Sequence, residues 1–246
     1  MKQSSNIAPE LSYIVPLYIQ NPQSTALADL IATYSNYSAA VLAKIQFIFV
    51  DDCSPVAIQL PACNLNMVLA RITSDIKWNQ PGARNLGVQL AKTAKIVLTD
   101  LDHLFPEALL KKMLRSREPQ HLNKFKRKNN GIAVKSHPNT FFCSKSVFYK
   151  SLGYDESFSG NYGYDDIFFL EMQKALGTKL RYFSYWHSIV HVEHKNTAIP
   201  EQHFLPRDTA VNEKLLQQKL ALIKSGQIFE SNERMHINFP YQMIHP

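Results

Sequence analysis

The first hundred residues alternate short apolar runs with segments whose apolar positions recur at helical spacing. Apolar runs at 13–17, 45–50, 67–70 and 96–99 predict four strands. Helical spacing over 25–34, and the Pro81-Gly82 start of a segment over 83–91, predict two helices between them. Strands that alternate with helices are typical of a largely parallel sheet whose faces are covered by helices.

The second half follows a less regular pattern. Helical spacing predicts helices at 106–117, 145–152, 165–175 and 208–223, and apolar runs predict strands at 141–142 and 188–192. The basic run 124–131 is predicted to be a solvated loop, with contact to a membrane or a phosphate as the alternative. Because no internal repeat or linker interrupts the chain, we expect one α/β domain over 1–246.

Composition narrows the class of protein only in part. The chain has 246 residues, of which 45% are hydrophobic, and 27 basic against 20 acidic residues give a net charge of +7. Such a charge suits nucleic acid, anionic lipid or phosphorylated substrates, and does not choose among them. The three cysteines lack metal-ligand spacing, which indicates free thiols in a reducing compartment. Without an apolar leader or a run of ~20 apolar residues, the sequence predicts a soluble or peripherally attached protein.

The strongest chemical signal is an acid pair after the fourth predicted strand, which ends on Asp100-Leu101-Asp102. Alternation along an extended chain points Asp100 and Asp102 the same way. Two carboxylates so placed repel unless a cation neutralises them, and ligands bind at the carboxyl ends of strands in open α/β sheets. The pair therefore predicts a divalent cation with open positions for phosphate oxygens, although a lone Asp-x-Asp is more often a solvated turn.

Two further segments offer polar groups at strand and helix ends. Asp51 and Asp52 follow the second predicted strand, where a carboxylate can accept hydrogen bonds from a ribose hydroxyl or a base N–H. The alternative is a turn that caps its own backbone. Arg84 lies at a predicted helix start, where it could bind a phosphate or carboxylate in bidentate fashion, or remain on the surface.

The segment 153–166 combines glycines, aromatic residues and acids, and ends on Asp165-Asp166 at a predicted helix start. Aromatic faces beside carboxylates suit sugars, and the helix dipole keeps a carboxylate at this end ionised and available as a base. The alternative is that both acids only cap the helix. Later, a predicted strand ends on Val190-His191-Val192-Glu193-His194, and we favour His191 over His194 as a further metal ligand.

The segments "IVPLY", "VDDCSP", "PGARNLG" and "DLD", in this order, resemble the GT-A glycosyltransferases, particularly glycosyltransferase family 2, over roughly residues 11–195. The resemblance implies a GT-A fold with a single mostly parallel central sheet flanked by helices. It implies a nucleotide-sugar-binding half at 11–105, an acceptor-binding and catalytic half at 131–195, and a C-terminal helix and tail at 200–246. It also implies a metal site for Mn²⁺ or Mg²⁺ at Asp100, Asp102 and His191. The donor-binding residues that it implies are Pro16, Tyr18, Asp51, Asp52, Arg84, Asp100 and Leu101.

The segment "GYDESFSGNYGYDD" is similar to the acceptor-side motif of galactosyltransferases and polypeptide N-acetylgalactosaminyltransferases. By that resemblance Asp166 is the catalytic base of an inverting enzyme, and Asp165, Tyr162 and Glu156 bind the acceptor. Tyr162 stands where those enzymes have a tryptophan.

We therefore expect a metal-dependent inverting glycosyltransferase that moves a sugar from a UDP-sugar such as UDP-Gal, UDP-GalNAc or UDP-Glc to a glycan or lipid-linked acceptor in polysaccharide biosynthesis. Nucleic acid is not an expected partner. The expected location is cytoplasmic, with peripheral contact to the inner face of a membrane through basic residues near 111–128.

Two rival functions use similar folds. A sugar nucleotidyltransferase needs a glycine-rich basic loop after the first strand, where this chain has Tyr18-Ile19-Gln20-Asn21-Pro22. A catalytically silent glycan- or sugar-nucleotide-binding module of an envelope-assembly complex remains as the other alternative. A hydrolase that uses two carboxylates fits poorly with metal-type acids at a nucleotide fold.

Overall fold

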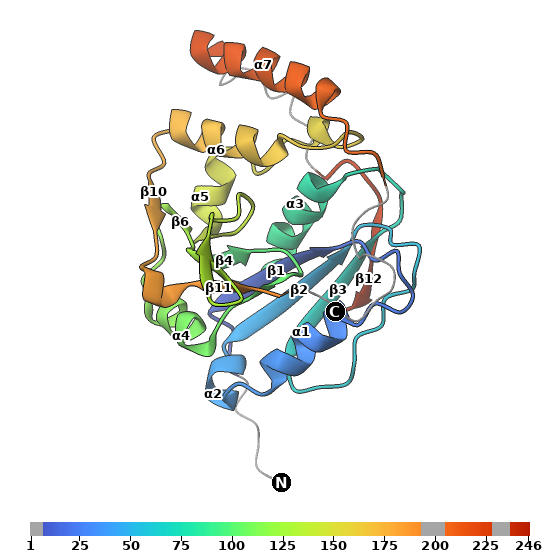
Figure 1. Ribbon diagram of the computed structural model, residues 1–246, viewed down its shortest axis with the longest axis vertical. Helices are drawn as coiled ribbons and strands as arrows, with labels where there is room; N and C mark the ends of the chain where they lie inside the picture. The colour runs from blue at the N-terminus through green and yellow to red at the C-terminus, as the bar shows by residue number, and fades with distance from the viewer. Residues whose placement is uncertain (1–6, 193–204, 228–236) are drawn as a thin grey trace.

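Four parallel strands form the centre of the largest sheet in the computed structural model, which describes residues 7–192, 205–227 and 237–246 (Figure 1). In the described residues the strand order of this sheet is β10-β6-β9-β4-β1-β2-β3-β12. Each of the four predicted strands overlaps one central strand, which confirms the mostly parallel sheet. The central strands are β4 (Lys95–Leu98), β1 (Leu11–Leu17), β2 (Ile45–Asp51) and β3 (Asn66–Ile72).

Helices cover both faces of the sheet, because successive side chains along each strand point to opposite faces. In β1, Tyr13 and Val15 enter one hydrophobic core while Ile14 enters the other. The first core packs beneath α1 (Ala26–Ser35), α2 (Ala39–Leu42) and α4 (Glu107–Arg115). The second packs beneath α3 (Gln80–Leu90), α5 (Lys145–Lys150) and α6 (Asp165–Ala175), and α7 (Ala210–Ser225) packs on the outer side of α6 (Figure 1).

An antiparallel strand pairs with the central strands at each side of the sheet. On one side β9 (Phe141–Ser144) pairs with β4, followed by β6 (Leu122–Lys124) and β10 (Leu180–Tyr182). On the other side β12 (Tyr241–His245) pairs with β3, so the predicted C-terminal tail contains a strand. None of the described helices is both long and apolar enough to cross a membrane.

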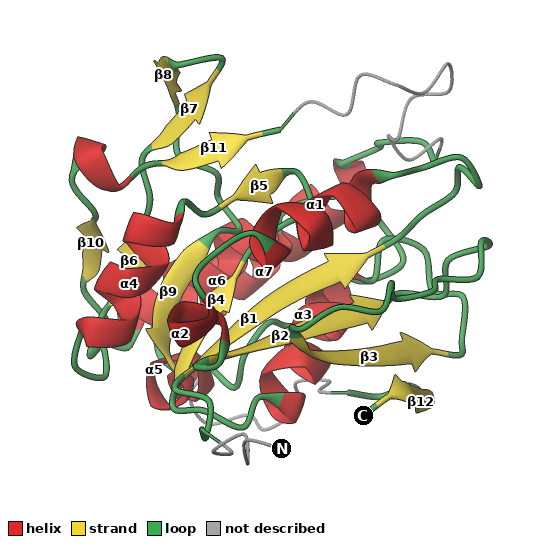
Figure 2. Cartoon of the chain, turned by 90° about the horizontal axis from the view of Figure 1, so that it is seen from below, coloured by secondary structure: helices red, strands yellow, loops and turns green. Residues whose placement is uncertain are grey.

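A smaller sheet has the order β5-β11-β7-β8 among the described residues and stands at one end of the molecule (Figure 2). Here the prediction of a solvated loop at 124–131 was wrong. The run contains the end of β6, all of β7 and a hairpin turn at Asn130 and Gly131, whose φ angles are 48° and 79°. Lys124 is buried, and its ammonium donates to the Pro138 carbonyl at 2.9 Å. The strands of this sheet are β5 (His103–Leu104), β11 (Ile189–His191), β7 (Arg127–Asn129) and β8 (Ile132–Val134).

Candidate functional site

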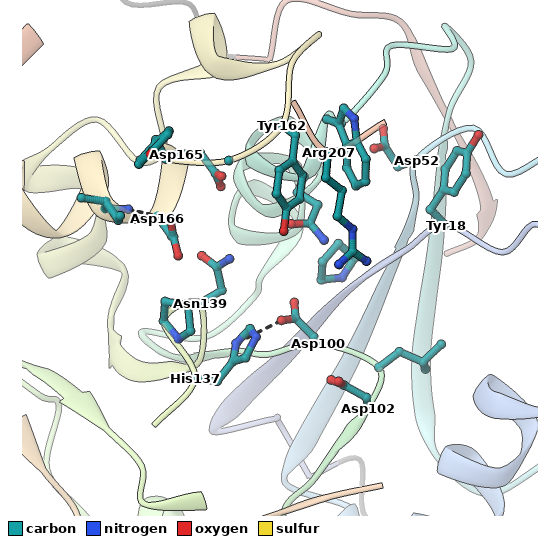
Figure 3. Close-up of a pocket in the computed structure, with 18 of the residues that line it drawn as sticks. Tyr18, Asp52, Asp100, Asp102, His137, Asn139, Tyr162, Asp165, Asp166 and Arg207 are labelled. Atoms are coloured by element: carbon teal, nitrogen blue, oxygen red, sulfur yellow. Dashed lines mark hydrogen bonds and ion pairs between the residues drawn. The ribbon is translucent and has the colours of Figure 1, made fainter. Parts of the chain in front are cut away.

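A cavity of about 880 Å³ opens at the carboxyl ends of the central strands (Figure 3). This is where an open α/β sheet binds its ligands, because the strands end there and leave a crevice between loops. The cavity brings together ten of the thirteen site residues that the sequence predicts. These ten are Pro16, Tyr18, Asp52, Asp100, Leu101, Asp102, Tyr162, Asp165, Asp166 and His191.

The two acids of the Asp-Leu-Asp segment both line the cavity, but not through the alternation of a strand. β4 ends at Leu98, and the backbone N–H of His103 donates to the Asp100 carbonyl at 3.2 Å, so the acids lie in a turn. The expected geometry of an extended segment is therefore corrected. The turn still presents both carboxylates to the same space (Figure 3).

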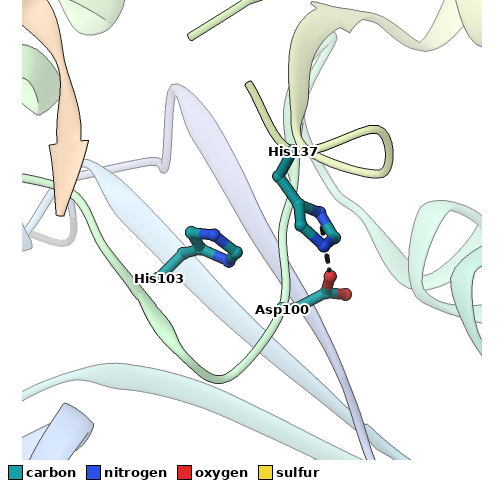
Figure 4. A group of neighbouring side chains, drawn as sticks. All are labelled: Asp100, His103 and His137. Carbon is teal, nitrogen blue, oxygen red and sulfur yellow. Dashed lines mark ion pairs between the residues drawn. The ribbon is translucent and has the colours of Figure 1, made fainter. Parts of the chain in front are cut away.

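Asp100 is held from behind by a buried arginine. The Arg84 guanidinium is fully buried and donates from Nη2 to Asp100 Oδ1, while its Nη1 lies 4.0 Å from Asp165 Oδ2. The side chain does not belong to the cavity lining, because its charge is turned toward the two aspartates. On its other side, Asp100 Oδ2 lies 3.2 Å from Nδ1 of His137 (Figure 4). Burial lowers the pKa of His137 below its usual value, which favours the neutral imidazole that binds metals.

Asp102 lies between two imidazoles. Its Oδ1 is 2.7 Å from Nδ1 of His103, and its Oδ2 is 3.4 Å from Nδ1 of His191. Asp102 Oδ1 and both Nδ1 atoms are buried, yet none has a hydrogen-bond partner of standard geometry. Burial opposes ionisation of Asp102, but the neighbouring imidazoles outweigh it and hold its pKa at about 2.

These atoms form two overlapping groups whose donor atoms lie within 4.8 Å of one another, one of Asp100, His103 and His137 and one of Asp102, His103 and His191. Carboxylate oxygens and imidazole nitrogens are ligands of divalent metal ions, and in the second group the buried Nδ1 atom of His191 has no hydrogen bond. His103 also faces Arg127, whose Nη1 lies 3.4 Å from its Nε2. Since an arginine can only donate, that contact favours the tautomer with the proton on Nδ1, directed toward Asp102. His194, the alternative ligand, lies outside the described residues.

The acids after β2 separate into two environments. Asp51 is buried outside the cavity lining, where it accepts from the Ser54 N–H at 2.8 Å and pairs with Arg71. Asp52 lines the cavity and accepts from the Asn79 side chain at 3.1 Å. Burial raises the pKa of Asp52 to about 7, and the charges of Asp51 and Asp75 add to the effect.

The opposite side of the cavity is formed by the start of α6. Gly163 and Tyr164 have φ angles of 88° and 68°, and this left-handed turn delivers Asp165 and Asp166 to the cavity. Burial and the charge of Asp166 raise the pKa of Asp165, against the opposing effect of Arg84. Asp166 is only half-buried, so its carboxylate is the one open to a substrate.

An aromatic pair with a cation lies beside these acids. The rings of Trp78 and Tyr162 meet edge to face at 4.7 Å, and the Arg207 guanidinium lies 5.6 Å from the Tyr162 ring centre. Among the described residues that line the cavity, Arg207 is the one arginine or lysine beside five aspartates. Figure 3 shows Arg207 extending into the cavity.

Glu156 has a different place from the one predicted for an acceptor-binding residue. It is buried outside the cavity lining, and its Oε1 accepts from Asn85 Nδ2 at 2.7 Å and from the Ile237 N–H at 2.6 Å. The carboxylate thus ties α3 to the segment that precedes β12. Sequence reasoning missed the other polar and aromatic lining residues, because isolated residues in loops carry no spacing signal. These are His137, Asn139, Trp78, Tyr164, Arg207 and Thr209, with Gln80 at the start of α3 and His103 behind them.

Comparison with known proteins identifies the fold. Residues 12–120, which span β1 to α4, match the family model Glycosyl transferase family 2. No curated protein has a matching sequence. Many solved structures match the fold of this chain, among them the following three.

S. aureus TarS 1-349 in complex with UDP-GlcNAc has a TM-score of 0.58 at 13% identity, over 86% of this chain and 66% of that one. The catalytic domain of Drosophila beta1,4galactosyltransferase 7 with xylobiose has a TM-score of 0.52 at 12% identity, over 85% and 79%. The mannosyltransferase PcManGT from Pyrobaculum calidifontis, in complex with GDP-Man and Mn²⁺, has a TM-score of 0.53 at 15% identity, over 93% and 66%.

The fold is therefore that of the GT-A glycosyltransferases, and the predicted resemblance to family 2 is confirmed over residues 12–120. Together the family match and the fold support a glycosyltransferase enzyme. The chain spans about two thirds of the length of the TarS fragment and of the mannosyltransferase. The acceptor-side motif at 153–166 stays a prediction.

Proposed function

We propose that this protein is a metal-dependent inverting glycosyltransferase that uses a UDP-sugar as donor and a glycan or lipid-linked acceptor. The observation that carries the proposal is one cavity with the carboxylates of Asp100 and Asp102 on one side and those of Asp165 and Asp166 on the other. The first pair suits a metal and a diphosphate, and the second suits a hydroxyl nucleophile.

The residues present fit a divalent metal, since the buried Nδ1 atom of His191 has no hydrogen bond and lies 3.4 Å from Asp102 Oδ2. Asp102 and His191 would hold it, with Asp100 as a further ligand, and the imidazole nitrogen favours Mn²⁺ over Mg²⁺. When bound, such an ion stabilises negative charge on the diphosphate leaving group. The presence of Mn²⁺ in the mannosyltransferase complex is consistent with this choice.

The donor is bound by the half of the cavity next to β1 and β2. Tyr18 and Pro16 border the nucleoside, and Asp52 accepts a hydrogen bond from it. Arg207 donates to the diphosphate, because it is the cation that extends into an otherwise acidic space. Arg84 acts as a positioning residue that fixes Asp100 and lies too deep for donor contact.

The acceptor is bound on the α6 side. Asp166 takes the proton of the acceptor hydroxyl as it attacks the anomeric carbon, and the bond from that carbon to the diphosphate oxygen breaks on the opposite face. A base on the face opposite the leaving group gives inversion. The ring edges and faces of Tyr162 and Trp78 offer an apolar wall to the acceptor sugar, with Asp165 as a hydrogen-bond acceptor.

UDP release from a panel of UDP-sugars, measured with and without Mn²⁺, tests the proposal. We expect turnover of at least one UDP-sugar with Mn²⁺ and none in excess EDTA. Binding of a UDP-sugar without turnover on any acceptor would favour the silent binding module. Formation of a UDP-sugar from UTP and a sugar phosphate would favour a nucleotidyltransferase.

A further inference from the structure

The positive charge of the chain is concentrated in two segments, 119–154 and 172–192, which contain ten basic residues and no acidic residue. Subtracting these ten from the 27 basic residues leaves 17, against all 20 acidic residues of the chain. The net charge of +7 therefore belongs to these segments, while the remainder is slightly acidic. The two segments meet in space, since β10 pairs with β6 and β11 pairs with β7.

Where the segments meet, three large aromatic side chains are turned to solvent. Trp186 is 87% exposed, Tyr182 53% and Tyr185 43%. The ammonium of Lys126 lies 5.2 Å from the Tyr182 ring centre, and that of Lys128 lies 4.4 Å from the Tyr185 ring centre. We call this surface the basic–aromatic patch. It consists of Lys126, Lys128, Lys135, Tyr182, Tyr185 and Trp186.

Strand register explains why the lysines share one side. Lys126 and Lys128 point the same way by alternation, and the pairing of Arg127 with Val134 places Lys135 opposite Lys126. Arg127 points to the other side, toward His103. The basic–aromatic patch thus lies on the side of β7 opposite Arg127, which contacts His103 beside the proposed metal site.

We propose that the basic–aromatic patch docks the protein on the anionic surface of a lipid bilayer. Tryptophan and tyrosine prefer the membrane–water interface, because their rings are apolar and their N–H and O–H groups polar. Lysines beside them are attracted by anionic headgroups. Because β11 runs from this surface to His191, docking holds the cavity close to the bilayer, where a lipid-linked acceptor is found.

The arrangement of the rings favours a bilayer over an acidic glycan. A glycan-binding surface presents open ring faces on which sugars stack, whereas the Tyr182 and Tyr185 rings each have a lysine ammonium of the protein itself over one face. Trp186 remains as a protruding apolar group. A protruding tryptophan flanked by cations is typical of interfacial insertion.

Flotation with vesicles of neutral phosphatidylcholine, with and without phosphatidylglycerol, tests the proposal. We expect the full chain to bind the anionic vesicles and not the neutral ones. The Lys126→Gln/Lys128→Gln variant should bind roughly 25-fold more weakly at low salt, at about fivefold for each cation, and the difference should shrink at high salt. Trp186→Ser should weaken binding at both salt concentrations, because its contribution is apolar.

The matched control is Lys112→Gln/Arg115→Gln, which removes the same charge from exposed positions of α4. It should weaken binding less than Lys126→Gln/Lys128→Gln does, because neither residue belongs to the basic–aromatic patch. Equal losses in both double variants, or no vesicle binding by the unaltered chain, would overturn the proposal. Binding to heparin without binding to vesicles, lost in the same variants, would instead assign the surface to an acidic polymer. Vesicle binding does not require transferase activity, so this outcome is separate from that of the proposed function.

Discussion

The guanidinium of Arg84 and the carboxylate of Asp100 form a buried ion pair that fixes one edge of the cavity. Arg84 is fully buried, and Asp100 and Asp165 are the acids near it. Removing one partner of a buried pair leaves the other charge uncompensated. The proposed metal and acceptor sides of the cavity therefore depend on one arginine.

Arg84→Met should lower the free energy of unfolding by about 3–5 kcal/mol, because Asp100 and Asp165 lose their buried counter-charge. Urea denaturation followed by circular dichroism measures this. Lys44→Met, which breaks the exposed pair with Glu10, is the control and should cost less than about 1 kcal/mol. Equal effects of the two substitutions would show that the buried pair contributes no more to the free energy of unfolding than the exposed pair does.

Metal binding should depend on the Asp102 side of the cluster. Asp102→Asn and His191→Ala should weaken Mn²⁺ binding by about 10–100-fold or more, since even loss of an outer-sphere partner has this scale. Titration of the protein with Mn²⁺, followed by the electron paramagnetic resonance signal of the free ion, measures the affinity. His187→Ala, outside both groups of possible ligands, should leave it unchanged. A larger effect of His137→Ala would move the ion to the Asp100 side, and one of His194→Ala would select the other histidine of the C-terminal pair.

The strands and the acids at their ends could be predicted because each leaves a local signal. An apolar run that ends on acids predicts a strand and places the acids at the edge of the sheet where the strand ends. Asp52, Asp100 and Asp102 were found in this way. His137 and Trp78 could not be predicted, because the tertiary fold alone brings these loop residues to the cavity. The hairpin at 127–134 was missed because β7 is entirely polar and β8, although apolar, has only three residues. Sequence alone does not reveal whether a charged side chain is already paired within the protein. Three predicted site residues are paired in this way: Arg84, Asp51 and Glu156.

Arg207→Gln should weaken UDP binding by about tenfold or more, because a charge-assisted hydrogen bond to the diphosphate is lost. Arg207→Lys keeps the charge and should recover part of the affinity, and calorimetry with UDP measures both. If uridine binding fell as much as UDP binding, the arginine would be contacting the nucleoside.

The contribution of Asp52 to stability should fall as the pH rises from about 4 to about 7. Its pKa is raised to about 7 in the folded protein by burial, so the folded state holds a proton that the unfolded state has released. This contribution is complete below the unfolded pKa and is lost as the pH passes the folded one. Asp52→Asn should therefore flatten the fall in Tm over this range and raise Tm at about pH 8. Asp51→Asn, which removes the partner of Arg71, should lower Tm there instead. Parallel Tm curves for Asp52→Asn and the unaltered protein would contradict the shifted pKa.

The two acids at the start of α6 should differ in their kinetic effects. Asp166 is open to the cavity, whereas Asp165 is buried beside Arg84. Asp166→Asn should lower kcat by about a hundredfold or more, the scale for loss of a positioned base, and leave the Kd of UDP nearly unchanged. Asp165→Asn should chiefly raise the acceptor KM, as loss of a binding contact does. Tyr162→Phe keeps the contact with Trp78 and serves as a control for general disturbance of this side.

NMR of the product gives a separate test, because a base opposite the leaving group requires inversion at the anomeric carbon. Retained configuration would reject Asp166 as the base even if its substitution abolished activity.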